Sequence, residues 1–138
     1  GYRQRKLSLG TEMIHHGTAP FLECSSHGDK RFSAFYARIP GRSNKSIEEL
    51  YQAAKVFPGG ATGLDWRAAK GRKPINIREC QLLYSKLWDE YIAANPELLD
   101  VLIEATGLSD KFGQPGHVCQ ATELWRIRNA KIRAGNRL

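Results

Sequence analysis

The stretch from Ser46 to Lys55, Ser-Ile-Glu-Glu-Leu-Tyr-Gln-Ala-Ala-Lys, constrains the fold more than any other part of this 138-residue chain. Ser46 followed three residues later by Glu49 is a capping box, in which each side chain accepts a hydrogen bond from the backbone N–H of the other residue. Pro58-Gly59-Gly60 cannot continue a helix. The pattern therefore predicts a helix from Ser46 to Phe57, with an apolar stripe at Ile47, Leu50, Ala54 and Phe57.

Polar groups gather on one flank of this predicted helix. Glu48, Gln52 and Lys55 lie beside the apolar stripe, and Tyr51 lies between them and the core. A carboxylate, an amide and an amine next to one aromatic ring can form the wall of a polar pocket. The alternative is an ordinary amphipathic helix on which Glu48 and Lys55 are solvated.

The remaining patterns predict a mainly α fold, a compact single-domain irregular helical bundle over residues 1–138. Further helices are expected over 62–69, 76–94, 95–107 and 122–134, with Asn76 and Glu79 as a second capping box and Gly107 as a C-terminal stop. Two strand-like runs, 21–24 and 31–39, flank a turn. They predict either one short two-stranded β ribbon near residues 21–39 or an aromatic loop packed over the core. The basic segment 1–20 shows no clear element.

Charge and cysteine content limit the class of protein. The net charge of +7 and the pI near 9.5 favour anionic partners such as nucleotides or nucleic acid, although the same charge also serves solubility. Three widely spaced cysteines argue against a disulfide framework and predict an intracellular, cytoplasmic protein. Neither a P-loop nor a Gly-x-Ser-x-Gly elbow occurs, and no apolar run approaches the roughly 20 residues of a membrane helix.

A zinc site is one alternative for the cysteines. Cys24-x-x-His27 and His117-x-Cys119 together contain four side chains of the kinds that bind zinc. The spacing within the second pair is tight, and the two pairs are far apart in the sequence.

The stretch Ser-x-Glu-x-x-Tyr-Gln-Ala-Ala-Lys also resembles the signature helix of the NADAR family of YbiA-like N-glycosidases. Phe32-Ser33-Ala34-Phe35 is similar to the aromatic-serine loop that precedes this helix in the family, and Ala69-Lys70-Gly71-Arg72 to its Ala-Lys-x-Gly-Arg element. Residues 87–107 resemble a later helix pair, so the likeness covers about residues 32–107. The family closes on an Asp-x-x-Trp-Gly element, whose divergent counterpart here is Glu123-Leu124-Trp125-Arg126.

This resemblance implies an N-glycosidase that needs no metal or cofactor and cleaves the bond between a base and a ribose. Glu48, which matches the signature Glu, would stabilise the oxocarbenium-like centre or orient the attacking water, and Lys55 would bind a phosphate or keep Glu48 ionised. The implied substrate is a phosphorylated ribosyl nucleotide or an ADP-ribosylated nucleic acid. The candidate substrate-binding residues are Ser33, Phe35, Tyr51, Gln52, Asp65, Trp66, Lys70, Arg72 and Trp125.

Each candidate also has a structural interpretation. An aromatic side chain packs in a core more often than it binds a ligand. Asp65 suits the start of a helix, and the cations of residues 70–78 suit a solvated loop as well as a phosphate. The alternative function is a non-catalytic basic module that binds nucleic acid or nucleotides, chiefly through the basic helix expected over 122–134.

Overall fold

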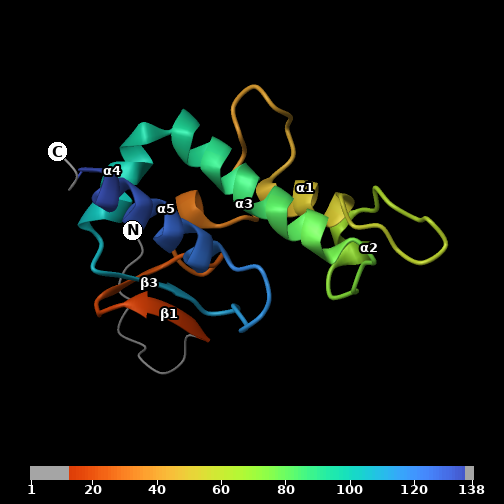
Figure 1. Ribbon diagram of the computed structural model, residues 1–138, viewed down its shortest axis with the longest axis horizontal. Coiled ribbons are helices and arrows are strands. Elements are labelled where there is room, and N and C mark those ends of the chain that lie inside the picture. Colours follow the sequence, from red (N-terminus) through yellow and green to blue (C-terminus); the bar gives the residue numbers. More distant parts are fainter. Residues whose placement is uncertain (1–12, 136–138) are drawn as a thin grey trace.

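The computed structural model describes residues 13–135 of the chain. Over this range the protein folds into five α-helices and one three-stranded sheet (Figure 1). Strands β1 (Ile14–Gly17), β2 (Phe21–Glu23) and β3 (Gly107–Asp110) lie in the order β1-β3-β2, with β3 antiparallel to β1 and parallel to β2. The prediction of a mainly α bundle is wrong, because this mixed sheet contributes Leu22 and Leu108 to the hydrophobic core.

The predicted two-stranded ribbon near residues 21–39 is also wrong. Phe21–Glu23 is a strand, but it pairs with β3, whose residues lie far away in the sequence. The second strand-like run overlaps instead a 3₁₀-helix, η2 (Lys30–Phe32), in which the Asp29 side chain accepts a hydrogen bond from the Arg31 N–H. Of the basic segment 1–20, residues 1–12 lie outside the described range, and Ile14–Gly17 forms β1.

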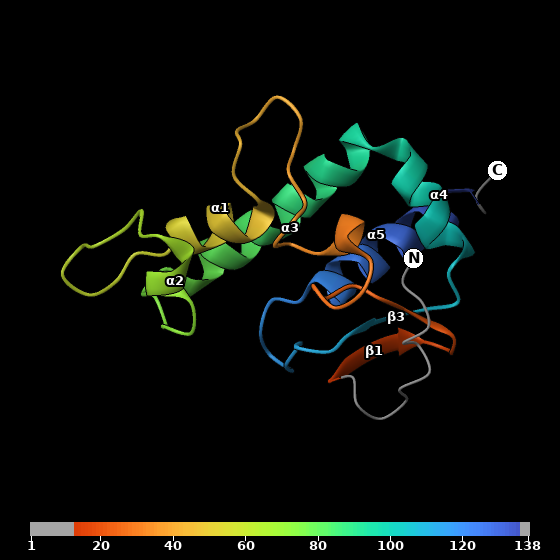
Figure 2. The same cartoon turned by 180° about the vertical axis from the view of Figure 1, so that it is seen from behind.

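The longest helix runs through the middle of the molecule. The helices are α1 (Ile47–Ala53), α2 (Trp66–Ala69), α3 (Ile77–Ala94), α4 (Pro96–Glu104) and α5 (Gln120–Gly135). The sheet, α4 and α5 lie toward one end of α3, and α1 and α2 lie toward the other end (Figures 1 and 2). Tyr84, Leu87 and Trp88 of α3 are buried in the hydrophobic core. None of the helices in the described range is long and apolar enough to cross a membrane.

Helix α1 begins at the predicted capping box. Ser46 Oγ accepts a hydrogen bond from the Glu49 N–H at 3.2 Å, and Glu49 Oε1 accepts one from the Ser46 N–H at 2.8 Å. The helix ends at Ala53, however, and does not reach Phe57.

The side chain of Asn76 accounts for this early end. Its Nδ2 donates to the carbonyl of Ala54 at 3.0 Å, and its Oδ1 accepts from the N–H of Val56 at 2.9 Å. The backbone groups that would form the next helical turn therefore pair with a side chain. These contacts occupy Asn76, so the predicted capping box with Glu79 does not form.

Gly107 lies in a strand and not at a helix end, since α4 stops at Glu104. A Cβ atom at this position would lie 2.7 Å from the Phe21 ring, 2.9 Å from the His16 carbonyl oxygen, and against the carbonyl oxygen of Thr18. Only a residue without a side chain lets the three segments approach each other so closely.

We expect Gly107→Ala to lower the free energy of unfolding by about 3 kcal/mol, because backbone atoms around the new methyl group must move. Urea unfolding followed by circular dichroism measures the change. Gly135→Ala is the matched control, since apart from its chain neighbours and the adjacent helix backbone no atom of the described residues lies within 4 Å of its added Cβ. An equal effect of the two substitutions would contradict the close packing of β3.

Candidate functional site

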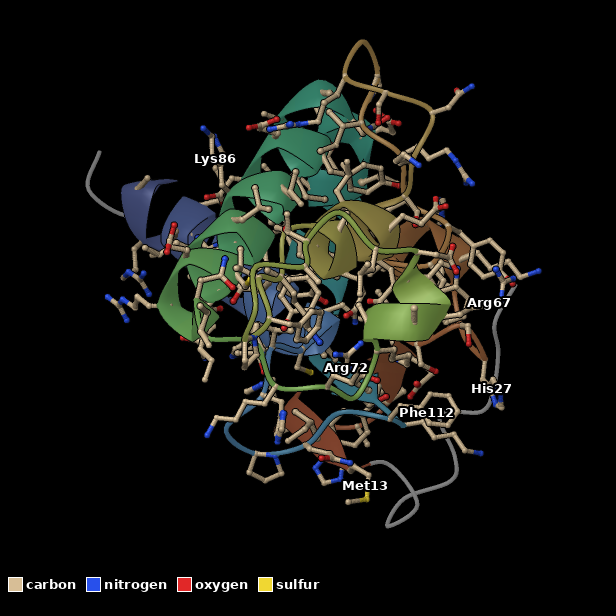
Figure 3. All side chains as sticks on the ribbon, turned by 90° about the vertical axis from the view of Figure 1, so that its right-hand side faces the viewer. Met13, His27, Arg67, Arg72, Lys86 and Phe112 are labelled. Atoms are coloured by element: carbon tan, nitrogen blue, oxygen red, sulfur yellow. The ribbon has the colours of Figure 1, made fainter. Side chains whose placement is uncertain are left out.

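An open cavity of about 1170 Å³ lies between α1, the first half of α3, the loop after α2 and the loop that joins β3 to α5. Figure 3 looks onto this end of the molecule, where Arg72 lies on the loop after α2 and Phe112 and Met13 lie below it. Seven of the residues predicted from the sequence line the cavity, namely Phe35, Glu48, Tyr51, Gln52, Lys55, Lys70 and Arg72.

Glu48 is buried in the cavity wall, with 7% of its surface exposed. Its Oε2 accepts hydrogen bonds from Gln52 Nε2 at 2.8 Å and from Lys70 Nζ at 3.4 Å. The capping box fixes the start of α1 and so places Glu48 in the first turn, where the helix dipole favours a carboxylate. The alternative in which Glu48 is solvated is therefore wrong.

Lys55 is buried beside Glu48 but bonds to the backbone of another segment. Its Nζ donates to the carbonyl oxygens of Ala69 at 3.2 Å and Arg72 at 3.0 Å, and it lies 5.6 Å from the centre of the Tyr51 ring. Burial lowers the pKa of this amine. Lys55 thus holds in place the loop that carries Lys70 and Arg72 to the cavity.

Two of the aromatic residues predicted from the sequence line the cavity and pack against other rings. Tyr51 packs edge-on against Tyr84 at 5.1 Å between ring centres, and burial raises the pKa of Tyr51 to about 12. Phe35 packs edge-on against Trp66 at 5.3 Å, with the Lys70 amine 5.1 Å from its ring centre. Trp66 therefore supports Phe35 and is not itself among the residues that line the cavity.

Three other candidates lie away from the cavity lining. Ser33 is fully buried, and its Oγ accepts a hydrogen bond from the Phe35 N–H at 3.4 Å. Asp65 is exposed and caps α2 by accepting from the Arg67 N–H at 3.2 Å. Trp125 of α5 stacks on His16 of β1, with ring centres 6.1 Å apart.

Sequence reasoning missed a second buried carboxylate, Asp110 at the end of β3, which is 3% exposed and lines the same cavity. Its Oδ2 accepts hydrogen bonds from Gln120 Nε2 at 3.0 Å and Cys119 Sγ at 3.2 Å, and its Oδ1 accepts one from the Phe112 N–H at 3.0 Å. Burial raises the pKa of the Asp110 carboxyl. No local pattern around Asp110 in the sequence marks its side chain as buried.

A chain of hydrogen bonds joins the Asp110 carboxylate to the backbone of Glu48 through Ala34. Gln120, which donates to Asp110, uses its Oε1 to accept from the Ala34 N–H at 2.7 Å. The Ala34 carbonyl in turn accepts from the Glu48 N–H at 2.9 Å. The aromatic-serine loop therefore fixes the position of α1 relative to the end of β3.

Positive side chains outnumber acids around the cavity. Among the lining residues that the structure describes, the acids are Glu48 and Asp110, whereas the lysines and arginines are Lys55, Lys70, Arg72, Lys73 and Lys111. The arginines of the basic helix α5 are less available to bind nucleic acid than the sequence predicted. Arg126 pairs with Asp89 and Glu123, both at 2.9 Å, and Arg128 donates to two backbone carbonyls.

The zinc alternative does not hold for Cys24, His27, His117 and Cys119. Across residues 13–135, no group of three or more His, Cys, Asp or Glu side chains is placed so that it could hold a metal ion. The three cysteines are buried and form no disulfide.

Comparison with known proteins finds no family model that matches the chain and no curated protein that matches it. The resemblance to the NADAR family therefore stays a prediction from the residues that carry it.

We expect Lys55→Met to lower the free energy of unfolding by about 1–3 kcal/mol, because the carbonyls of Ala69 and Arg72 lose a buried donor. Chemical denaturation provides the measurement. Lys73→Met is the matched control, as an exposed lysine of the same cavity, and should change stability by less than about 0.5 kcal/mol. If Lys55→Met were as mild as this control, Lys55 would not be holding the loop.

Proposed function

We propose that the cavity hydrolyses the N-glycosidic bond of a phosphorylated ribosyl substrate, such as an ADP-ribosylated nucleobase. One observation carries the proposal. Two buried carboxylates, Glu48 and Asp110, line one cavity in different environments, and cations surround them. In many hydrolases, two carboxylates in unlike surroundings divide the roles of acid and base.

Glu48 is the residue proposed to face the sugar. Gln52 and Lys70 both donate to its Oε2, and no residue within 13–135 donates a hydrogen bond to its Oε1. That second oxygen is therefore free to stabilise positive charge at C1′ and to accept a proton from the attacking water.

Asp110 is proposed as the general acid. As the bond between C1′ and the base nitrogen breaks, its electron pair stays on the base, which takes a proton from the Asp110 carboxyl. Water adds to C1′ and gives its proton to Glu48, and exchange with solvent restores both groups. The raised pKa of Asp110 supports this role, since a carboxyl that holds its proton at higher pH can donate it.

The cations support a phosphorylated substrate. Arg72, Lys73 and Lys111 line the cavity and form no ion pair with any residue of the described range. An arginine and lysines placed together suit phosphate oxygens. The resemblance to the NADAR signature helix supports the same reaction, and the unpaired state of Cys24, Cys80 and Cys119 supports an intracellular setting.

We expect Glu48→Gln to reduce turnover by about a thousandfold or more while the protein stays folded, because the amide cannot stabilise the cationic centre. Chromatography of released base and sugar measures this on ADP-ribosylated guanine and thymine in DNA, NAD-derived nucleotides and ribosylaminopyrimidine phosphates.

Glu49→Gln is the control for Glu48→Gln, because it changes an acid of the same helix whose carboxylate only caps Ser46. It should keep the turnover of the wild type. Salt-sensitive binding of nucleic acid without turnover of any substrate would instead favour the non-catalytic binding module.

The pH dependence tests Asp110. We expect kcat/KM to fall as the pH rises through the raised pKa of Asp110, because the ionised carboxylate has no proton to donate. Asp110→Asn should remove this alkaline limb and slow turnover by about 100-fold or more, with a smaller loss for substrates whose leaving base needs no protonation. An unchanged pH profile in Asp110→Asn would exclude Asp110 as the acid.

A further inference from the structure

Gln52 carries a buried oxygen that the protein leaves without a hydrogen bond. The residue is 4% exposed and belongs to the cavity lining, one helical turn after Glu48. Its Nε2 donates to Glu48 Oε2 at 2.8 Å. The opposite amide orientation would place two acceptor oxygens against each other, so the position of Oε1 follows from this contact.

Gln52 Oε1 accepts no hydrogen bond from any residue in the described range. A buried acceptor without a donor is unfavourable, and such groups are rare in folded proteins. The neighbouring amines bond elsewhere, since Lys55 donates to the carbonyls of Ala69 and Arg72 and Lys70 reaches Glu48 Oε2. The orphaned oxygen therefore points to a donor that arrives with a ligand.

The chemistry around Gln52 limits what this donor is. Glu48 Oε1 also accepts no hydrogen bond from residues 13–135, so Gln52 and Glu48 place two unpaired acceptors one helical turn apart on this wall of α1. A phosphate has only acceptor oxygens to offer when fully ionised and does not suit such a wall. Hydroxyl groups of a sugar do suit it, because each can donate one hydrogen bond.

We propose that Gln52 Oε1 accepts a hydrogen bond from the sugar hydroxyl next to the scissile bond, so that Gln52 selects ribosyl over 2′-deoxyribosyl substrates. The inference rests on the proposed function, which places C1′ of the sugar at Glu48. Oε1 is closed to bulk water, so the proposal requires neighbouring side chains of the cavity wall to move before the hydroxyl reaches it. A deoxy sugar would leave the buried oxygen unpaired in the complex, which is an effective way to reject it.

The test is a cycle of two ligands and two proteins. Wild type and Gln52→Met are each measured with ADP-ribose and with the analogue that lacks the 2′-hydroxyl on the reacting ribose, by calorimetric titration. For a substrate that turns over, kcat/KM is also measured for its ribosyl form and for its 2′-deoxyribosyl form. Gln81→Met is the matched control, because Gln81 lines the same cavity on α3 and has no contact with Glu48 among the hydrogen bonds of the described residues.

Wild type should prefer the ribosyl ligand by about tenfold or more. Gln52→Met should weaken binding of the ribosyl ligand by a similar factor and change the affinity for the deoxy ligand by less than about twofold. The preference would then disappear. Gln81→Met should keep it. A preference that survives in Gln52→Met, or an equal loss for both ligands, would overturn the inference. The equal loss would mean that Gln52 holds a water molecule or only positions Glu48.

The outcomes separate this inference from the proposed function. If turnover depends on Glu48 but shows no sugar preference linked to Gln52, the proposed glycosidase activity stands and the proposed role of Gln52 is rejected. If binding shows a preference for the ribosyl ligand that depends on Gln52 but no substrate turns over, the proposed sugar recognition stands and the glycosidase activity is rejected. Neither binding nor turnover by the wild type would reject both.

Discussion

A carboxylate that is withdrawn from water must be paired, and the arrangement of this site depends on how Glu48 meets that requirement. Burying an unpaired charge would cost several kcal/mol. Gln52 and Lys70 both donate to Glu48, and the loop that carries Lys70 is held by the buried amine of Lys55. One buried acid thus fixes the relation between α1, α2 and the loop that follows α2.

The second buried acid organises the opposite side of the cavity in a different way. Asp110 has no ion-pair partner among residues 13–135 and is held by Cys119, Gln120 and the backbone of Phe112. Burial raises the pKa of Asp110, and hydrogen bonds from these three donors offset that rise only in part. The hydrogen-bond partners of Glu48 and Asp110 thus differ, since a lysine and an amide donate to Glu48, whereas a thiol, an amide and a backbone N–H donate to Asp110.

The two sides of the cavity are joined where the aromatic-serine loop passes between them. The backbone of Ala34 receives a hydrogen bond from Glu48 and donates one to Gln120, so a shift of this loop would move both carboxylates. This gives Phe32-Ser33-Ala34-Phe35 a structural reason to stand beside the helix. Ser33 acts from within this loop, where its buried hydroxyl accepts a hydrogen bond from the Phe35 N–H.

Local patterns predicted the elements whose stability is local. The capping box and apolar stripe predicted the start of α1, because both signals involve residues about one turn apart, and the helix expected over 76–94 is present as α3. The sheet escaped prediction since its strands have three or four residues each, and β3 is buried throughout and lacks alternation. The end of α1 was also missed, because the side chain of Asn76 decides it from another part of the chain.

The sequence by itself determined that Glu48, Tyr51, Gln52 and Lys55 share one flank of a helix, since helical geometry follows from spacing alone. Only the tertiary structure decided what each of them does. It buried Glu48 between Gln52 and Lys70, turned Lys55 toward two backbone carbonyls, and brought Asp110 from a distant strand to the same cavity. These outcomes depend on which segments pack together, and that choice is made by the buried core and its hydrogen bonds over the whole chain.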